Sequence, residues 1–207
     1  MTRRTLAVVS AGLGQPSSTR LLADQLAAAA RDELVRRGHE VELRTVELRD
    51  HAHDVVNNML TGFPSAALRE ALDTVAGADG VVAVTPIFNA SYNGLFKSFF
   101  DVVEAGSLVD RPVLIAATGG TARHSLALEH AVRPMFSYLR AVVVPTAVFA
   151  APEDWSGSVA DGALRGRILR AAAELADQVE RRPPSTGPVD PFALTTDFAQ
   201  LLGGRDG

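Results

Sequence analysis

The chain carries Thr85-Pro86-Ile87-Phe88-Asn89-Ala90-Ser91-Tyr92-Asn93-Gly94-Leu95-Phe96-Lys97-Ser98-Phe99-Phe100-Asp101 between an apolar run and a helical pattern. The run, Val81 to Val84, predicts a buried strand, so the stretch is a loop at the carboxyl end of a strand. In open α/β sheets, ligands bind at such ends. The aromatic and short polar side chains of this loop favour a planar heteroaromatic ligand. An ordinary strand-to-helix turn is the alternative.

Outward from this loop, strand patterns recur along the chain. Apolar runs typical of strands covered on both faces lie at Leu6 to Val9, Gly80 to Thr85 and Val113 to Ala117. Val41 and Leu43 alternate with charged residues, which predicts an edge strand. The last apolar run, residues 142–149, contains Pro145, which predicts an edge strand or a bulge.

Helical spacing of apolar residues fills the intervals between the strands. Helices are expected from Ser17 or Ser18 to Gly38, from Pro64 to Val75, from Gly94 to about Glu104, from Arg123 to Leu139, and from Val159 to Val179. Pro134 should kink or split its helix. Residues 49–62 predict a short helix or an ordered loop. The alternation predicts an α/β fold: a flavodoxin-like three-layer α/β/α sandwich with a five-stranded parallel sheet in the order 2-1-3-4-5.

The chain divides into one domain, residues 1–182, and a carboxyl-terminal linker and apolar arm, residues 183–207. The arm is apolar enough that we expect it to dock on its own domain or on a neighbouring subunit.

Composition excludes several classes of function. The net charge is −4 with scattered basic residues, which argues against a nucleic-acid surface. There is no cysteine, so disulfides, thiolate catalysis and cysteine-metal sites are excluded, and a reducing cytoplasm is expected. The first apolar run is too short for a signal peptide, and no run reaches membrane-spanning length.

Three loops should meet at one rim of the sheet, because the carboxyl ends of the three central strands lie together there. These loops are residues 10–20, 86–94 and 118–121. In the first, Ser17, Ser18 and Thr19 stand at a helix amino terminus, which favours a phosphate, and Arg20 can add charge. A plain helix cap at Ser17 is the alternative.

Two other phosphate-binding motifs fit less well. A nucleoside-triphosphate P-loop needs a lysine that this loop lacks. A dinucleotide fingerprint would have Ser17 where its third glycine belongs, and its acidic residue would be Glu47, which is rather far along the chain. The dinucleotide motif remains a weak competitor.

The chain resembles the NAD(P)H-dependent FMN reductases of flavodoxin-like fold over residues 4–180. The most specific piece is Pro86 to Lys97, which is similar to the family pattern Pro-x-Tyr-x-x-Ser-x-x-Gly-x-Leu-Lys, with Phe88 in place of tyrosine. Residues 17–20 resemble the family's phosphate loop, and residues 118–121 its third loop. The stretch Thr118 to His124 resembles the subgroup partnered with luciferase-like flavin monooxygenases.

The resemblance implies a set of residues that contact FMN or NAD(P)H. They are Ser10, Gln15, Ser17, Ser18, Thr19, Arg20, Pro86, Ile87, Phe88, Asn89, Ala90, Ser91, Thr118, Gly119, Gly120, Thr121 and Arg123. Hydride would pass directly from nicotinamide to flavin, so no catalytic nucleophile is expected. The amides of Gly119 and Gly120 would stabilise charge on the flavin. No metal site is expected, because His124 and His130 lack neighbouring carboxylates.

The first interpretation is an NAD(P)H:FMN oxidoreductase that forms a homodimer or homotetramer and supplies a flavin-dependent monooxygenase. The runner-up is an FMN-bound quinone or azo reductase. A third interpretation is a flavodoxin-like electron carrier without enzymatic activity, and a fourth is a structural domain that binds no flavin.

Overall fold

The computed structural model describes residues 2–155 and 158–185. In these residues the centre is a seven-stranded, mostly parallel sheet whose main path is β2-β1-β3-β5-β6. The strands are β1 Arg3–Ser10, β2 Glu40–Glu47, β3 Gly80–Phe88, β4 Ser91–Tyr92, β5 Pro112–Thr118, β6 Val142–Val143 and β7 Val148–Ala150. The predicted flavodoxin-like order is confirmed, with β5 as the fourth predicted strand and β6 with β7 as the fifth.

Two features raise the number of strands from the predicted five to seven. The last strand is interrupted at Pro145, which has no N–H to donate, so β6 and β7 pair separately with β5. The chain also folds back after Phe88, and β4 pairs antiparallel with β3 through Phe88 and Ser91. The expectation that Pro86 to Phe88 form a loop is therefore wrong, because Pro86 still pairs with Thr118 of β5 and the pairing with β4 extends β3 to Phe88.

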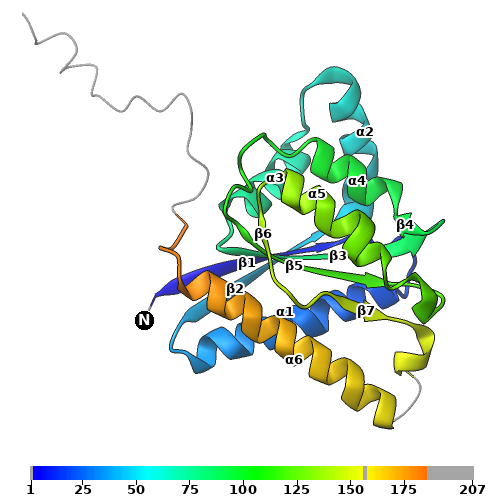
Figure 1. Cartoon of the computed structure of the whole chain (residues 1–207). Coiled ribbons are helices and arrows are strands. Elements are labelled where there is room, and N and C mark those ends of the chain that lie inside the picture. Colours follow the sequence, from blue (N-terminus) through cyan, green and yellow to red (C-terminus); the bar gives the residue numbers. More distant parts are fainter. Residues whose placement is uncertain (1, 156–157, 186–207) are drawn as a thin grey trace, which may run out of the picture.

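The helices lie on both faces of the sheet (Figure 1). They are α1 Ser18–Arg36, α2 Ala52–Thr61, α3 Ala66–Gly77, α4 Gly94–Asp101, α5 Arg133–Tyr138 and α6 Ser158–Glu180, with short turns η1 Leu48–His51, η2 Ala122–His124, η3 Leu128–Val132 and η4 Pro152–Trp155. Figure 1 shows α1 and α6 on one face and α3, α4 and α5 on the other. None of the described helices has the length and apolar character of a membrane span.

The structure changes two of the helical predictions and decides a third that had two alternatives. Helix α4 ends at Asp101, three residues before the predicted end at Glu104. The helix expected from Arg123 to Leu139 is divided into η2, the π-helical η3 and α5. Pro134 stands in the first turn of α5 and does not split the helix, because η3 leads directly into α5 at Arg133; the interruption lies before η3 instead. Residues 49–62 form η1 and α2, and α2 ends at Gly62 with a φ of 79°.

The core has two halves, one on each face of the sheet. Alternate residues of β1 explain this, since Leu6 and Val8 belong to the cluster under α1 and α6, whereas Ala7 and Val9 belong to the other. In the second half, aromatic rings join α4 to α5: the ring of Phe100 lies 4.9 Å from that of Phe96 and 4.8 Å from that of Phe136. These edge-to-face contacts fix the helix that follows the β4 hairpin.

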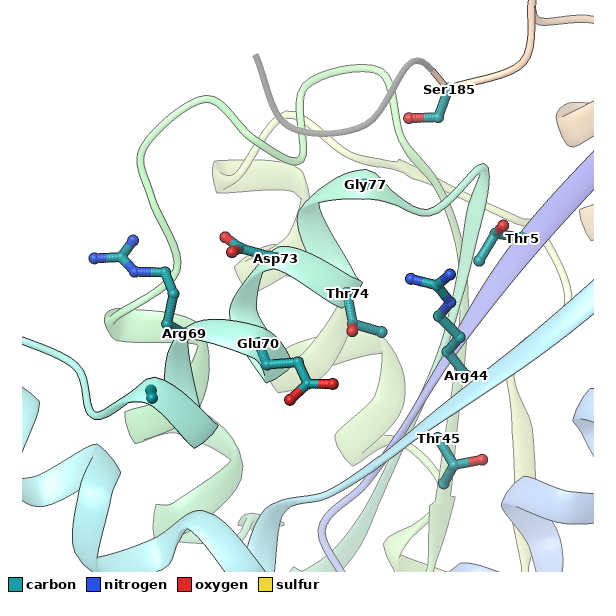
Figure 2. A pocket seen from close by; sticks show the side chains of 10 residues that line it. Thr5, Arg44, Thr45, Arg69, Glu70, Asp73, Thr74, Gly77 and Ser185 are labelled. Carbon is teal, nitrogen blue, oxygen red and sulfur yellow. The ribbon is translucent and has the colours of Figure 1, made fainter. Parts of the chain in front are cut away.

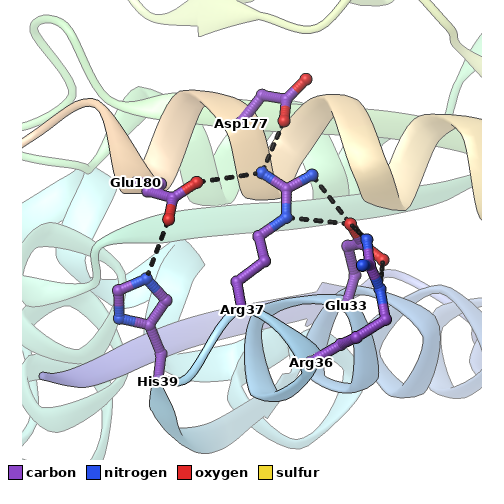
Figure 3. Close-up of polar contacts among 6 residues, drawn as sticks. All are labelled: Glu33, Arg36, Arg37, His39, Asp177 and Glu180. Carbon is purple, nitrogen blue, oxygen red and sulfur yellow. Dashed lines mark hydrogen bonds and ion pairs between the residues drawn. The ribbon is translucent and has the colours of Figure 1, made fainter. Parts of the chain in front are cut away.

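A cluster of charged side chains joins the carboxyl ends of α1 and α6 (Figure 3). The Arg37 guanidinium donates to Asp177 at 2.5 Å, to Glu180 at 3.2 Å and to Glu33 at 2.9 Å. His39 stands 3.6 Å from Glu180. The cluster holds the two helices of this face together at the end of the sheet far from the predicted rim.

Candidate functional site

A cavity of about 490 Å³ lies at the rim where β1, β3 and β5 end. It is lined by residues from all three predicted loops and from the end of β7: Leu13, Gly14, Pro16, Ser17, Ser18, Thr19, Pro86, Ile87, Phe88, Thr118, Gly119, Gly120, Ala150, Pro152 and Trp155. The lining is apolar on the β3 and β7 sides and carries hydroxyl groups at the start of α1. One end can therefore receive a polar anion and the other a flat ring.

The first loop presents the amino terminus of α1 to the cavity. Ser17 is the N-cap, and its hydroxyl accepts from the Arg20 N–H at 3.2 Å. The N–H groups of Ser18 and Thr19 have no carbonyl one turn earlier in the helix, so they suit a bound anion. Gly12 makes this arrangement possible, because a Cβ there would stand 2.0 Å from the Ser17 Oγ.

The second loop is a two-residue hairpin between β3 and β4. Asn89 has a φ of 49° and Ala90 a φ of 68°, and positive φ at both central residues is typical of a type I′ turn. Alanine rarely adopts this conformation, so the backbone here is strained by about 1 kcal/mol or more. The hairpin leaves Phe88 48% exposed at the edge of the cavity.

The third loop is held from two sides. The Thr118 Oγ1 lies 2.8 Å from the Thr19 Oγ1, and both side chains are buried. The Gly119 N–H donates to the Ala150 carbonyl at 3.1 Å, which leaves the Gly120 N–H as the candidate donor to a ligand. A Cβ at Gly119 would stand 2.7 Å from the Phe149 ring. The loop is thus packed too closely for a side chain at that position.

Comparison with known proteins identifies the family. The sequence profile of the NADPH-dependent FMN reductases matches residues 4–156. The chain belongs to the NADPH-dependent FMN reductase family. It is 37% identical over 169 residues to an FMN reductase (NADPH) of Pseudomonas aeruginosa, covering 81% of this chain and 88% of that protein. It is equally similar, with the same coverage, to the NADH-dependent FMN reductase SfnE of Pseudomonas putida.

Solved structures agree with this assignment. An oxidoreductase from Corynebacterium diphtheriae superposes with a TM-score of 0.85 at 45% identity. The match covers 88% of this chain and 100% of that one. The apo form of the NADH:FMN oxidoreductase EMOB superposes with a TM-score of 0.68 at 27% identity. The match covers 82% of this chain and 88% of that one. The protein is an NAD(P)H-dependent FMN reductase with FMN and NAD(P)H as its substrates or cofactors.

Not every residue expected to contact the flavin lines the cavity of this FMN reductase. The exceptions are Ser10, Gln15, Arg20, Asn89, Ala90, Ser91, Thr121 and Arg123. Ser10 is fully buried, whereas Gln15 and Arg123 are exposed. Ser91 is in β4, and Thr121 caps η2 by accepting from the Arg123 N–H at 3.4 Å.

Arg20 differs most from its expected role. Its guanidinium donates to Asp24 at 2.7 Å and also to Glu47. The hydrogen bond to Asp24 is the main cause that raises the pKa of Arg20, and Glu47 adds to it. The carboxylates of Asp24 and Glu47 thus neutralise the positive charge of Arg20, which was expected to contact a phosphate. The pairing also occupies Glu47, the residue that the dinucleotide motif would need.

Several residues at the site were missed by sequence reasoning. Ala150, Pro152 and Trp155 line the cavity from the end of β7. The rule applied to the other strands, that ligands bind beyond carboxyl ends, could have found them. Leu13, Gly14 and Pro16 also line the cavity, but only polar residues of the first loop were predicted to contact a ligand.

A second hollow, of about 980 Å³, lies between the edge of the sheet and α3. Figure 2 shows Arg44 of β2 and Glu70 of α3 facing it from opposite sides. Among the described residues, its lining carries charges of both signs and no aromatic ring, and it includes Thr5 and Gly77, far from the carboxyl ends of the strands. The smaller rim cavity fits a flavin better, because it combines an apolar wall with a helix amino terminus.

The described side chains were also compared with the arrangement that a metal site requires. Within residues 2–155 and 158–185, no three His, Asp or Glu side chains come together in a way that could hold a metal ion.

Proposed function

We propose that this FMN reductase binds FMN at the rim cavity as an exchangeable substrate, reduces it with NAD(P)H, and releases FMNH2 to a separate flavin-dependent monooxygenase. The observation that carries the proposal is the composition of the cavity: a helix amino terminus with hydroxyl groups at one end and an apolar wall at the other. Phe88 and Leu13 are each 48% exposed at the mouth. An open mouth of this kind favours exchange over permanent retention.

The phosphate of FMN fits the start of α1. The hydroxyls of Ser17 and Ser18 and the N–H groups of Ser18 and Thr19 provide the donors. Arg20 contributes little net charge, because Asp24 and Glu47 are bonded to it. Binding would therefore depend on neutral donors and on the helix dipole.

The ring of the flavin fits between β3 and the third loop. Pro86, Ile87 and Phe88 form one apolar wall, and the Gly120 N–H would donate to the polar edge of the ring. The bound flavin itself accepts the hydride. The protein's part is to orient the two substrates and to keep water from the contact between them.

Delivery to a monooxygenase is supported by the Thr118 to His124 stretch, which resembles the reductase subgroup that has such partners. We propose further that the protein forms a homodimer or homotetramer and works in the reducing cytoplasm, which suits a chain without cysteine. The division at residue 183 stays a prediction, and residues 186–207 of the proposed arm lie outside the described part of the chain. Sedimentation of the full chain would give its oligomeric state.

The test is steady-state oxidation of NADPH or NADH by flavin-free protein over a series of FMN concentrations. Saturable turnover with FMN as the varied substrate supports the proposal. Turnover that needs an added quinone or azo compound, with FMN retained through gel filtration, would favour the alternative reductase. Coupling is then measured by adding a luciferase-type monooxygenase and its substrate, and product formation without added FMNH2 is the expected result.

A further inference from the structure

Asn93 connects two of the three loops that line the rim cavity. It stands between β4 and α4, and its side chain is 2% exposed. Its Oδ1 accepts from the Phe96 N–H at 2.7 Å, which caps α4. Its Nδ2 donates to the Ala11 carbonyl at 2.8 Å, at the start of the first loop. One amide group thus contacts both loops at once.

A helix cap alone does not account for asparagine at this position. Serine, threonine and aspartate supply a capping oxygen equally well. Of the common N-cap residues, only asparagine also carries an amide donor on the same side chain, and here that donor spans 82 positions of sequence. The bond to Ala11 is therefore a separate feature from the cap.

Both backbone polar groups of Ala11 are hydrogen-bonded. Its N–H donates to the Val84 carbonyl at 2.9 Å, and its carbonyl accepts from Asn93. The next residue, Gly12, packs against Ser17, where a Cβ would come within 2.0 Å of the Oγ. A shift of Ala11 is consequently passed on to the helix start that the proposed function assigns to the phosphate.

We propose that Asn93 is a positioning residue that sets the distance between the phosphate end and the ring end of the flavin site. This inference rests on the proposed binding of FMN at the rim. Asn93 does not line the cavity, so it acts through Ala11 and through the hairpin that precedes it. Loss of the Nδ2 donor should misplace the first loop relative to β3 while α4 keeps its cap.

The experiment compares FMN with riboflavin, which has the same ring and no phosphate. In Asn93→Ser the cap oxygen remains and the donor to Ala11 is lost. We expect the Kd of FMN to rise about tenfold and that of riboflavin to change less than about twofold, because only FMN must satisfy both ends of the site. Flavin fluorescence quenching measures both constants, and Asn93→Thr, which also keeps a cap oxygen without the amide donor, should show the same difference between the two flavins.

Ser65→Ala is the matched control, because Ser65 caps α3 by accepting from the Leu68 N–H at 3.1 Å and does not line the rim cavity. It should lower Tm and leave both flavin constants unchanged. Equal weakening of FMN and riboflavin in the Asn93 variants, or no change in either, would overturn the positioning role. A wild-type protein that binds neither flavin would instead refute the proposed function, so the two failures are distinguishable.

Discussion

The hydroxyls of Thr19 and Thr118 lie 2.8 Å apart across the base of the rim cavity. Thr19 is 3% exposed and Thr118 is 5% exposed, so neither has ready access to water as a substitute partner. The bond links the first turn of α1 to the end of β5, 99 residues later. Together with the bond from Asn93 to Ala11, it holds all three loops of the site in one arrangement.

Thr118→Val is predicted to destabilise the protein. Valine has nearly the same shape, but it leaves the buried Thr19 hydroxyl without this partner, at a loss of about 1–3 kcal/mol of unfolding free energy. Urea denaturation of wild type and variant measures this loss of unfolding free energy. In the double variant, with Thr19→Val as well, both hydroxyls are gone, so its loss should be smaller than the sum of the two single losses. Strictly additive losses would show that the two hydroxyls do not interact.

Gly119→Ala is predicted to unfold at a lower temperature than wild type. The added Cβ would stand 2.7 Å from the Phe149 Cζ, and that ring is only 8% exposed, so it has little room to move. Overpacking of this kind typically costs about 1–3 kcal/mol. Gly120→Ala is the matched control, since within the described part of the chain its added Cβ would meet nothing closer than 4 Å beyond its own chain neighbours. Calorimetry that gave equal Tm values for the two variants would contradict the close packing.

Much of the fold could be predicted from local patterns. Leu6 to Val9 is apolar on both faces and is central, whereas the alternation at Val41 and Leu43 marks an edge strand. The β4 hairpin could not be predicted, because Asn89-Ala90 lacks the glycine that normally signals a type I′ turn. The hairpin nevertheless forms, with Ile87 paired to Tyr92 and Phe88 to Ser91.

The site was predicted in position but less well in detail. The rule that loops meet at carboxyl ends of strands places Ser17, Phe88 and Thr118 around one cavity, as the structure does. It cannot say which way a long side chain turns, and Arg20 turns to Asp24 and Glu47. Nor can it find Asn93, whose partner is a backbone carbonyl distant in sequence.

Ala90→Gly is predicted to stabilise the protein. Glycine adopts the observed φ of 68° without strain, which outweighs its greater freedom in the unfolded chain by about 0.5–1 kcal/mol. Tm should therefore rise. Ala28→Gly, in the middle of α1, is the control of opposite sign, since glycine in a helix interior costs about 1 kcal/mol. A fall in Tm for both variants would argue against a left-handed Ala90.

The charged cluster between α1 and α6 predicts a pH dependence of stability. Hydrogen bonds from Arg36 and then from Arg37 hold the pKa of Glu33 below its ordinary value of 4.5. A carboxylate whose pKa is lowered in the folded state stabilises the protein fully above the unfolded value, and this stabilisation is lost as the pH falls through the folded value. The stability advantage of wild type over Glu33→Gln should thus be constant near neutral pH and shrink below about pH 4.5.

Chemical denaturation of both proteins from pH 7 to pH 3 measures this advantage. Glu40→Gln, a neutralisation on the exposed amino end of edge strand β2, controls for the general effect of removing one negative charge. Since the ion pairs with Glu33 are partly exposed, added salt should reduce the advantage at neutral pH as well. An advantage that grew as the pH fell would mean that Glu33 is not stabilised as a carboxylate, and that Arg37 binds the end of α6 through Asp177 and Glu180 alone.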